Sequence, residues 1–491
     1  MPADLASYAD HLETPRGRGA LASAPHQGAA GGAACGDLVR IAVRVEGATV
    51  VEAGFDARGC SAAEAAGSAV VELVDGAPVL DAARVSADHV AAELGGLDAS
   101  RHHAAALAAD ALHRALGAAA AGGAARLAPL EGRTLVAMSG GVDSAVAARL
   151  ALEAGHEVVG VTVELWADAE GDGTRSCCSP QAVSGARALA HSMGLPHLTL
   201  DLRERFRREV VEDFVAEHAA GRTPNPCVRC NGLVRFDEML RLSEALGAGR
   251  LATGHYARIV RDPHGPLLEA AADAGKDQSY MLARLAPADL ERLWFPLAER
   301  PKAQVRAHAR RAELPVAEKA ESQDLCFLSG VGQPAFLRRH GGEALRSTGT
   351  PGEIVSTDGR LLGHHDGQER FTVGQRRGIG VAGPDPLYVV AKDAARNRVT
   401  VGLRSALAHT RVRVSDTVLR RPSGRVDAVK LRYRSRPVAC RVVGHHGAGV
   451  HAELELVLDS PVEGVAPGQT ACLMEGARVL GAGVIEGGRG A

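Results

Sequence analysis

The sequence predicts a multidomain chain that joins α/β and β architecture, and three observations lead to this class. Residues 134–152 form the pattern of a buried strand, a glycine-rich turn and a helix, which is how a parallel α/β domain begins. Before them, a hairpin pattern followed by helical periodicity indicates a small α+β domain. After about residue 341, short strands alternate with glycine-rich turns, as in a small central β domain and a C-terminal β-barrel. A chain of 491 residues has room for three or four such domains.

The first domain is expected over residues 1–116. After a weak helix near residues 3–12, we expect a two-stranded hairpin and then three helices, at residues 38–45, 49–55, 62–74, 86–94 and 103–116. The run 117–127 is almost entirely alanine and glycine, so we expect a linker over residues 117–132.

The second domain is expected over residues 133–340, and its first turn carries Ser139, Gly140 and Gly141. Glycines let a backbone approach a ligand closely, and the helix that follows presents free N–H groups and the positive end of its dipole. The turn therefore suits a phosphate. It is not a Walker A loop, because no Gly-Lys-Ser/Thr follows. Further strands and helices are expected at residues 158–163, 181–195, 197–201, 204–219 and 250–256.

The last two domains are expected over residues 341–408 and 409–491. Residues 411–441 contain ten Lys and Arg against two Asp. On a strand over 428–434, Lys430, Arg432 and Arg434 would share one face, because side chains alternate along a strand. This face is either a phosphate-binding patch or an ordinary solvated surface.

Composition limits the class of protein further. The net charge is −2, so nucleic-acid binding requires a local basic patch. No apolar run reaches the length of a membrane span, and the N-terminus lacks the basic-then-apolar order of a signal peptide. We therefore expect a cytoplasmic protein that does not contact a membrane. Nine scattered cysteines in a reducing compartment favour metal-binding or catalytic thiols over a disulfide framework.

Two cysteine motifs stand out. Cys227 and Cys230 form a Cys-x-x-Cys pair in a proline-rich loop, and Cys326 lies far along the chain. A single pair could be half of a structural zinc site, but no second pair stands at zinc spacing. Catalytic thiols are the alternative that this spacing leaves.

The turn Ser-Gly-Gly-Val-Asp-Ser resembles the PP-loop of ATP pyrophosphatases, which adenylate a substrate oxygen. With the cysteine motifs, the chain resembles the tRNA-specific 2-thiouridylases of the MnmA family over about residues 134–486. The further matching motifs are Thr-Gly-His-Tyr at 253–256, Gly-Lys-Asp-Gln-Ser-Tyr at 275–280, Phe-Thr-Val-Gly-Gln-Arg at 371–376, Leu-Tyr-Val-Val at 387–390, Lys-Leu-Arg-Tyr-Arg at 430–434 and Ala-Pro-Gly-Gln at 466–469.

This resemblance implies an ATP-dependent exchange of oxygen for sulfur at position 2 of the wobble uridine, with Mg²⁺ balancing phosphate charge. It implies a persulfide on Cys326, Cys230 as the second thiol, and Asp143 as a catalytic residue. The implied ATP-binding residues are Ala137, Met138, Ser139, Gly140, Gly141, Val142, Asp143, Ser144, Val163 and Gly254. The implied tRNA-binding residues are Asn225, Pro226, Cys227, His255, Lys276, Asp277, Gln278, Arg432, Tyr433 and Gln469. The partners are tRNA and a sulfur donor, either a cysteine desulfurase or a relay protein.

Cys227 departs from the family, much of which has aspartate there. Cys227, Cys230 and Cys326 then make a three-thiol set, which can hold a [4Fe–4S] cluster with one open iron. A cluster-dependent mechanism and a simple persulfide mechanism both stay open.

The first domain resembles the NifU N-terminal/IscU iron–sulfur scaffolds. The matching motifs are Ala-Cys-Gly-Asp at 34–37, Gly-Cys-Ser-Ala at 59–62 and Ala-Ala-Asp-Ala-Leu at 108–112. The family's third cysteine is absent, because Ala104 follows the histidine pair. One metal ion on Cys35, Asp37, Cys60 and His103 is one expectation, since these donors suit zinc or iron. A degenerate docking or sulfur-relay domain is the other.

Two competing functions also remain. One is an iron–sulfur or sulfur-carrier assembly protein with an inactive PP-loop. The other is a different PP-loop adenylating enzyme, such as an amidotransferase synthetase, although no glutaminase-like domain is evident.

Overall fold

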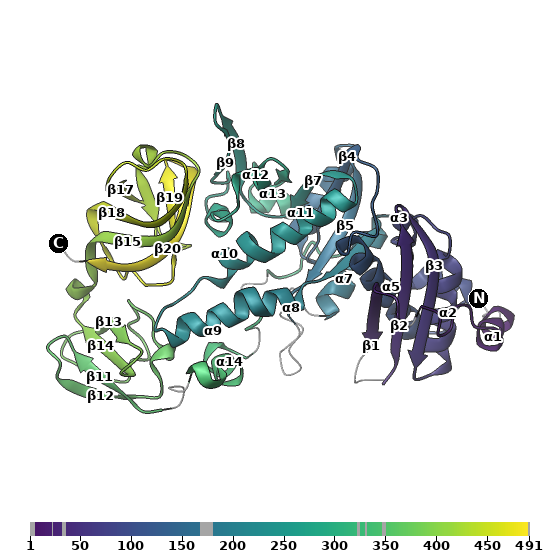
Figure 1. The fold of residues 1–491 in the computed structure, drawn as a ribbon, viewed down its shortest axis with the longest axis horizontal. Helices are drawn as coiled ribbons and strands as arrows, with labels where there is room; N and C mark the ends of the chain where they lie inside the picture. Colours follow the sequence, from purple (N-terminus) through teal and green to yellow (C-terminus); the bar gives the residue numbers. More distant parts are fainter. Residues whose placement is uncertain are drawn as a thin grey trace.

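The structure is a computed structural model that describes residues 5–21, 23–31, 36–166, 180–321, 325–328, 331–345 and 350–489. Its units follow one another in space much as they do in the sequence (Figure 1). The N-terminal domain lies at one end, the parallel α/β domain lies in the middle, and the two β units lie side by side at the other end. The predicted multidomain α/β plus β class is confirmed.

The N-terminal domain is a three-stranded antiparallel sheet, ordered β1-β2-β3, covered by helices. Its elements are α1 Leu5–Glu13, β1 Gln27–Gly31, β2 Leu38–Glu46, β3 Thr49–Arg58, α2 Ser61–Val74, α3 Val79–Ala82, α4 Ala87–Glu93 and α5 His102–Ala121. The predicted hairpin is β2–β3, and the three predicted helices are α2, α4 and α5. Strand β1 and the short helix α3 were not predicted.

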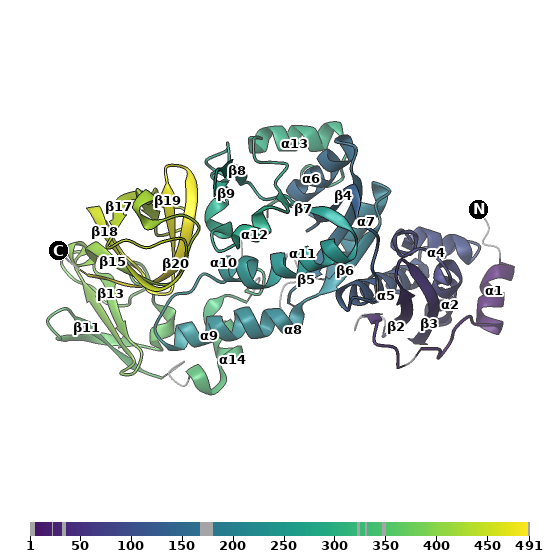
Figure 2. The same ribbon diagram turned by 45° about the horizontal axis from the view of Figure 1, so that its top comes forward.

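The second domain is built on a five-stranded parallel sheet ordered β10-β7-β4-β5-β6. The strands are β4 Leu130–Ala137, β5 Glu157–Glu164, β6 His197–Asp201, β7 Ala248–Thr253 and β10 Leu293–Trp294. Helices α6 Val142–Glu153, α7 Pro180–Ser192 and α13 Lys302–Arg311 pack beside it (Figure 2). The predicted strand–turn–helix–strand order is present as β4, α6 and β5.

Two long helical segments run between this sheet and the β units (Figure 1). The first contains α8 Arg203–Phe206 and α9 Glu212–Ala219, joined by a π-helical turn, and corresponds to the helix predicted at 204–219. The second contains α10 Pro226–Cys230 and α11 Phe236–Ala245, also joined by a π-helical turn. Short helices α12 Pro287–Leu290 and α14 Gln333–His340 complete the domain.

The central unit is a four-stranded sheet, ordered β12-β11-β14-β13, and the C-terminal unit is a six-stranded barrel that closes through the β15–β20 pairing. The central strands are β11 Gly352–Ser356, β12 Leu361–His365, β13 Tyr388–Asp393 and β14 Arg398–Gly402. The barrel strands are β15 Ala408–Leu419, β16 Ala428–Lys430, β17 Val438–Val442, β18 Gly449–Glu463, β19 Thr470–Glu475 and β20 Arg478–Arg489. A hairpin from the α/β domain, β8 Arg258–Asp262 and β9 Gly265–Glu269, extends the barrel sheet through β9 and β20.

The first part of the alanine- and glycine-rich run predicted as a linker over residues 117–132 is helical. Helix α5 continues through Gly117 to Ala121 and packs against β6. A Cβ atom on Gly117 would lie 2.0 Å from the carbonyl oxygen of Thr199. The small residues therefore serve a close helix–strand contact between the first two domains, which sequence composition alone does not distinguish from a flexible segment.

The same contact contains a buried network of charges and histidines. Arg187 lies 2.5 Å from Asp110 on α5, and Arg114 pairs with both Asp110 and Glu164. His113 is fully buried and bonds the carbonyl oxygen of His197 at 2.7 Å. These bonds fix the N-terminal domain against the α/β domain. Among the described helices, none has both the length and the apolar character needed to cross a membrane.

The strand predicted over 428–434 is also shorter than expected. Strand β16 ends at Lys430, and Arg432 and Arg434 lie in the turn that follows. Lys430 approaches Asp277 at 3.7 Å, and Arg432 donates to the carbonyl oxygen of Gly464. The three basic residues therefore do not share one strand face, because the chain turns immediately after Lys430.

Candidate functional site

The turn that the sequence predicts to bind phosphate lies between β4 and α6. Gly140 has φ of +68°, a conformation that favours glycine, and Gly141 precedes the first residue of α6. Ser144 donates to the carbonyl oxygen of Gly141 at 3.0 Å and accepts from the backbone N–H of Ser139 at 3.1 Å. No side chain caps α6, so its first N–H groups face the turn and suit an anion.

Gly254 lies directly against the start of α6. A Cβ atom there would lie 2.7 Å from the carbonyl carbon of Asp143 and from the backbone nitrogen of Ser144. Only glycine lets the loop after β7 pass this close to the turn. Val163 is half-buried near the end of β5, the strand beside β4. The structure therefore gathers the sequence-predicted nucleotide residues at the carboxyl edge of the sheet, where ligands of open α/β sheets bind.

Asp143 is the centre of a charged network at this edge. Lys302 Nζ lies 2.7 Å from each of its carboxylate oxygens, and Tyr256 donates its hydroxyl to Oδ1 at 2.8 Å. Burial and the negative charge of Asp143 raise the pKa of Tyr256, so its hydroxyl stays protonated. The arrangement orients the Asp143 carboxylate at the first turn of α6.

Glu321 connects this network to the cysteine segment. Its carboxylate accepts from Lys276 at 2.6 Å and lies 2.9 Å from Lys302. The bond from Lys276, together with Lys302, lowers the pKa of Glu321 to about 2. Glu321 stands five residues before Cys326, so the two lysines hold the start of the segment that carries that thiol.

Sequence reasoning did not single out Lys302, Lys319, Tyr256 or Glu321 as site residues. Lys319 donates to the carbonyl oxygen of Gly140 at 2.9 Å, on the turn itself. Lys302 opens α13, where the helix dipole disfavours a cation, and this unusual position is the cue that could have found it.

The loop predicted to hold the target base is tightly positioned. Asn225 caps α10 by accepting from the backbone N–H of Val228 at 3.2 Å, and Pro226 takes the first helical position. Gln469, from the barrel, donates to the carbonyl oxygen of Thr223 at 2.7 Å. Gln469, which is predicted to bind tRNA, therefore lies beside the loop that is predicted to hold the target base (the base loop).

The remaining predicted tRNA residues have clear structural partners. Gln278 accepts from the backbone N–H of Tyr256 at 2.9 Å, and Asp277 accepts from Ser279 Oγ at 3.0 Å. His255 packs near Phe236 and Phe295, and burial lowers its pKa to about 3, so the ring is neutral. Tyr433 is half-buried with its ring 6.1 Å from that of Tyr280.

The thiols come from two segments. Cys227 and Cys230 lie on α10, three residues apart and so on one side of the helix, and Cys230 is 6% exposed. Cys326 is half-buried in a turn whose neighbour, Phe327, packs against Phe214 and Phe336. These three cysteines form no disulfide. The barrel cysteines Cys440 and Cys472 are instead buried, and burial raises the pKa of each to about 12.

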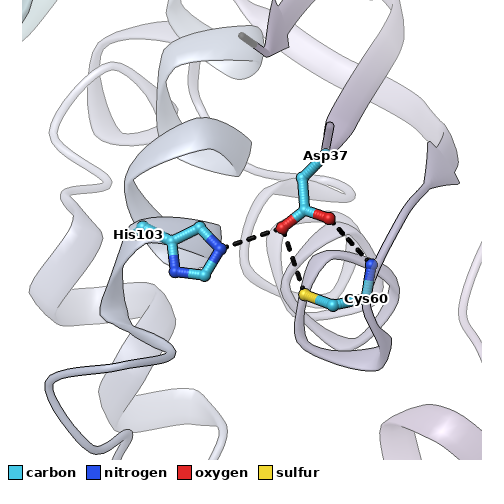
Figure 3. Close-up of side chains that lie close together, drawn as sticks. All are labelled: Asp37, Cys60 and His103. Atoms are coloured by element: carbon cyan, nitrogen blue, oxygen red, sulfur yellow. Dashed lines mark hydrogen bonds and ion pairs between the residues drawn. The ribbon is translucent and has the colours of Figure 1, made fainter. Parts of the chain in front are cut away.

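The N-terminal domain brings Asp37, Cys60 and His103 together (Figure 3). Asp37 is 4% exposed, and its carboxylate accepts from Cys60 Sγ at 3.2 Å and lies 2.9 Å from His103 Nε2. The bond from His103 lowers the pKa of Asp37, and the same bond raises the pKa of His103. Their ligand atoms lie within 4.8 Å of one another. Cys35, the fourth predicted ligand, lies outside the described residues.

Models of known families match four consecutive parts of the chain. Residues 6–121 match the NifU-like N terminal domain, and residues 132–330 match the tRNA methyl transferase HUP domain. Residues 335–403 match the tRNA methyl transferase PRC-barrel domain, and residues 410–485 match the aminomethyltransferase beta-barrel domain. Fold and family models together define a HUP-domain protein with a glycine-rich turn between β4 and α6, a Cys-x-x-Cys helix and a fused NifU-like domain.

Full-length relatives identify the family. The chain is 44% identical over 489 residues to the bifunctional protein NifU/MnmA of Rubrobacter xylanophilus, covering 97% of each chain. It is 45% identical over 356 residues to the tRNA-specific 2-thiouridylase MnmA of Syntrophotalea carbinolica, covering 72% of this chain and 97% of the relative. The chain belongs to the bifunctional NifU/MnmA family, whose larger part is a tRNA-specific 2-thiouridylase of the MnmA family.

Among solved structures, the chain is similar to the U34-tRNA thiolase NcsA from Methanococcus maripaludis with its [4Fe-4S] cluster. The TM-score is 0.27 at 18% identity, over 42% of this chain and 63% of that one. A likeness this low carries no argument about mechanism.

Proposed function

We propose that this chain catalyses ATP-dependent 2-thiolation of the wobble uridine of tRNA. The observation that carries the proposal is that one HUP domain holds both the phosphate-binding turn and the three thiols Cys227, Cys230 and Cys326. Glu321 bridges the lysine at the turn and the segment that leads to Cys326. Membership of the 2-thiouridylase family supports the substrate and the reaction.

The first step is adenylation of uridine oxygen 2. The oxygen attacks the α-phosphorus of ATP, pyrophosphate leaves, and a poor leaving group becomes AMP. Free N–H groups at the start of α6 and the hydroxyl of Ser139 supply donors for the phosphates. Asp143 suits Mg²⁺, which prefers one or two carboxylates together with phosphate oxygens. When bound, Mg²⁺ would neutralise charge on the departing pyrophosphate.

The second step transfers sulfur. In the persulfide form, the terminal sulfur on Cys326 attacks carbon 2 of the adenylated uridine and AMP leaves. The Cys230 thiolate then attacks Sγ of Cys326, which releases 2-thiouridine and leaves a Cys230–Cys326 disulfide. An external dithiol must reduce this disulfide before the next turnover. Cys230 is buried, so the disulfide forms away from bulk solvent.

The thiol set also fits a [4Fe–4S] cluster, because three thiolates can ligate three irons. Cys227, Cys230 and Cys326 would hold it, and such a cluster supplies an open iron that binds sulfide. Measurement of bound iron and sulfide distinguishes this cluster from the persulfide form, which uses only Cys230 and Cys326.

We assign the target-base and tRNA contacts to the loop 225–227, to Lys276–Gln278, to Gln469 and to the three residues named below. Lys276 and Gln469 support this assignment most directly, since one contacts Glu321 and the other contacts the base loop. His255, Arg432 and Tyr433 complete the proposed tRNA set. The reaction needs reduced thiols, so we place it in the cytoplasm.

In the N-terminal domain, Asp37, Cys60 and His103 offer oxygen, sulfur and nitrogen ligands that suit one zinc or iron ion. Ala104 is fully buried where the scaffold pattern has a cysteine, so the ligand set for cluster assembly is incomplete among these residues. We propose that this domain, with Cys35 as a further ligand, binds a single metal ion or relays sulfur. A cysteine desulfurase or relay protein is the proposed donor.

The test is an anaerobic assay with purified chain, unmodified tRNA, MgATP and a sulfide or persulfide donor, read out as AMP and 2-thiouridine. We expect both products from the wild type, neither from Asp143→Ala, and AMP without 2-thiouridine from Cys326→Ala. Circular dichroism checks that each variant is folded. Nucleotide hydrolysis without tRNA, or 2-thiouridine formed by folded Asp143→Ala, would contradict the proposal. Ammonia-dependent product formation would favour a different PP-loop enzyme.

A further inference from the structure

Two lysines flank the phosphate-binding turn from outside the sequence motif that defines it. Lys302 opens α13, and its Nζ lies 2.7 Å from both carboxylate oxygens of Asp143 and 2.9 Å from Glu321. Lys319 follows α13, and its Nζ donates to the carbonyl oxygen of Gly140 at 2.9 Å. We infer that Lys302 and Lys319 form a clamp that binds the β- and γ-phosphates of ATP and stabilises the departing pyrophosphate. This inference rests on the proposed adenylation.

The position of Lys302 destabilises its positive charge unless an anion lies nearby. A cation in the first turn of a helix faces the positive end of the dipole. The side chain is only 12% exposed, so the ammonium group also loses much of its hydration. Asp143 and Glu321 compensate it here, and Asp273 fixes its backbone by accepting from the Lys302 N–H at 2.9 Å. The ammonium is therefore held rigidly at the edge of the turn.

Lys319 contributes a different kind of evidence. Its side chain is exposed, and in the described part of the chain its hydrogen bond goes to a backbone carbonyl of the turn and not to a carboxylate. Gly140 belongs to the glycine pair at which we expect phosphate to bind. A phosphate seated there would lie close to the Lys319 ammonium group, whose charge is available to it because a neutral carbonyl does not neutralise it.

Together the two ammonium groups supply what the turn lacks. The turn offers N–H groups and hydroxyls but no cationic side chain between Ala137 and Ser144. A triphosphate carries several negative charges, and a leaving pyrophosphate gains charge in the transition state. Lysine is a compact charge with three donors, well suited to phosphate oxygens. On nucleotide binding, Lys302 would turn from Asp143 to a phosphate oxygen while keeping Glu321.

The experiment measures binding of MgATP and of adenosine to the full chain without tRNA, by calorimetry. We expect Lys302→Ala and Lys319→Ala each to weaken MgATP binding about ten- to hundredfold, because each removes a charge-assisted bond to phosphate. Adenosine binding should stay within about twofold, which also shows that the variants are folded. Lys302→Arg and Lys319→Arg should recover part of the MgATP affinity. Arg311→Ala, an exposed arginine at the far end of α13, is the matched control.

A second measurement separates a phosphate contact from mere support of Asp143. If Lys302 acts only by orienting Asp143, then Lys302→Ala should have no further effect in an Asp143→Asn background. We expect it to weaken MgATP binding there too, and to weaken inhibition by pyrophosphate. Unchanged MgATP affinity in both alanine variants would overturn the clamp. Failure of the wild type to bind MgATP would instead contradict the proposed function itself.

Discussion

Cys227, where the resemblance leads us to expect aspartate in much of the family, shares one side of α10 with Cys230. If the thiols act as a persulfide relay, Cys227→Asp should be tolerated, because Cys230 and Cys326 remain. If a cluster is used, Cys227→Asp removes one of three thiolates and should lose iron and activity together. We expect the second outcome, with loss of most iron and at least tenfold less 2-thiouridine.

The measurement is iron, sulfide and 2-thiouridine in anaerobically reconstituted wild type and Cys227→Asp. Cys440→Ser is the control, because that thiol is buried in the barrel. A fully active wild type that contains no iron would end the cluster mechanism and leave Cys230 and Cys326 as a redox pair.

At the scale of single elements, α5 shows how a helix joins two domains. Gly117 allows the helix to touch the backbone of β6, and an added Cβ atom would lie 2.0 Å from the carbonyl oxygen of Thr199. Gly117→Ala should therefore lower the free energy of unfolding by about 1–3 kcal/mol, as overpacking of tight cores does.

The control is Gly185→Ala in α7, a helical glycine with nothing within 4 Å of its added Cβ atom. It should be neutral or raise stability by about 0.5–1 kcal/mol, since alanine is the better helix former. Thermal unfolding of both variants gives the comparison. Equal stability of Gly117→Ala and wild type would mean that the helix–strand contact is looser than described.

The turn after β16 carries exposed positive charges that can be tested for tRNA binding. Arg434 and Arg436 are exposed, and neither forms an ion pair with a carboxylate in the described chain. Lys430, by contrast, approaches Asp277 at 3.7 Å and is 13% exposed. The phosphate-binding part of this region is therefore expected in the turn and not on the strand.

We predict that the double variant Arg434→Ala/Arg436→Ala binds tRNA more weakly. The slope of the logarithm of its binding constant against the logarithm of the salt concentration should become shallower by about two, one for each lost phosphate contact. Lys430→Ala should leave the slope unchanged. Filter binding from low to moderate salt measures both. A double variant with the wild-type slope would return this turn to an ordinary solvated surface.

At the scale of the whole molecule, the contact between the first two domains should respond to acid. His191 faces His113, His197, Arg187 and His89, and its ring donates an N–H to the carbonyl oxygen of Ala83. Burial, with the nearby positive charge of Arg187, lowers its pKa to about 4. The pKa values of His113 and His197 are also lowered by burial.

An unfolded histidine binds its proton near pH 6.5, so the unfolded chain takes up protons first and stability falls as pH drops from about 6.5 to 4. In His191→Gln, the free energy of unfolding should therefore fall by about 1–3 kcal/mol less over this pH range than it does in the wild type. Thermal unfolding at several pH values tests it, with His264→Gln, on an exposed turn, as the control. Identical pH profiles of wild type and His191→Gln would show that the ring does not stay neutral in the folded protein.

The sequence by itself determined the order of the domains' main elements and the nucleotide turn. Strand–turn–helix periodicity and the glycines of residues 139–144 are local properties, because backbone conformation and helix capping depend on near neighbours. The hairpin β2–β3 and most helices of the first domain were predictable for the same reason. The cysteine motifs likewise needed only their spacing and the family pattern.

Tertiary structure decided what lies across the turn and between the domains. Asp143, Lys302 and Glu321 are separated in the sequence, so only folding brings the Lys302 ammonium group within 3 Å of both carboxylates. The alanine-rich run continues helix α5 because Gly117 lets the helix pack closely against the backbone of β6. Strand β16 ends at Lys430 because the chain turns directly after it. Such contacts between distant residues leave no periodic pattern, because packing partners are chosen by shape and charge after local structure has formed.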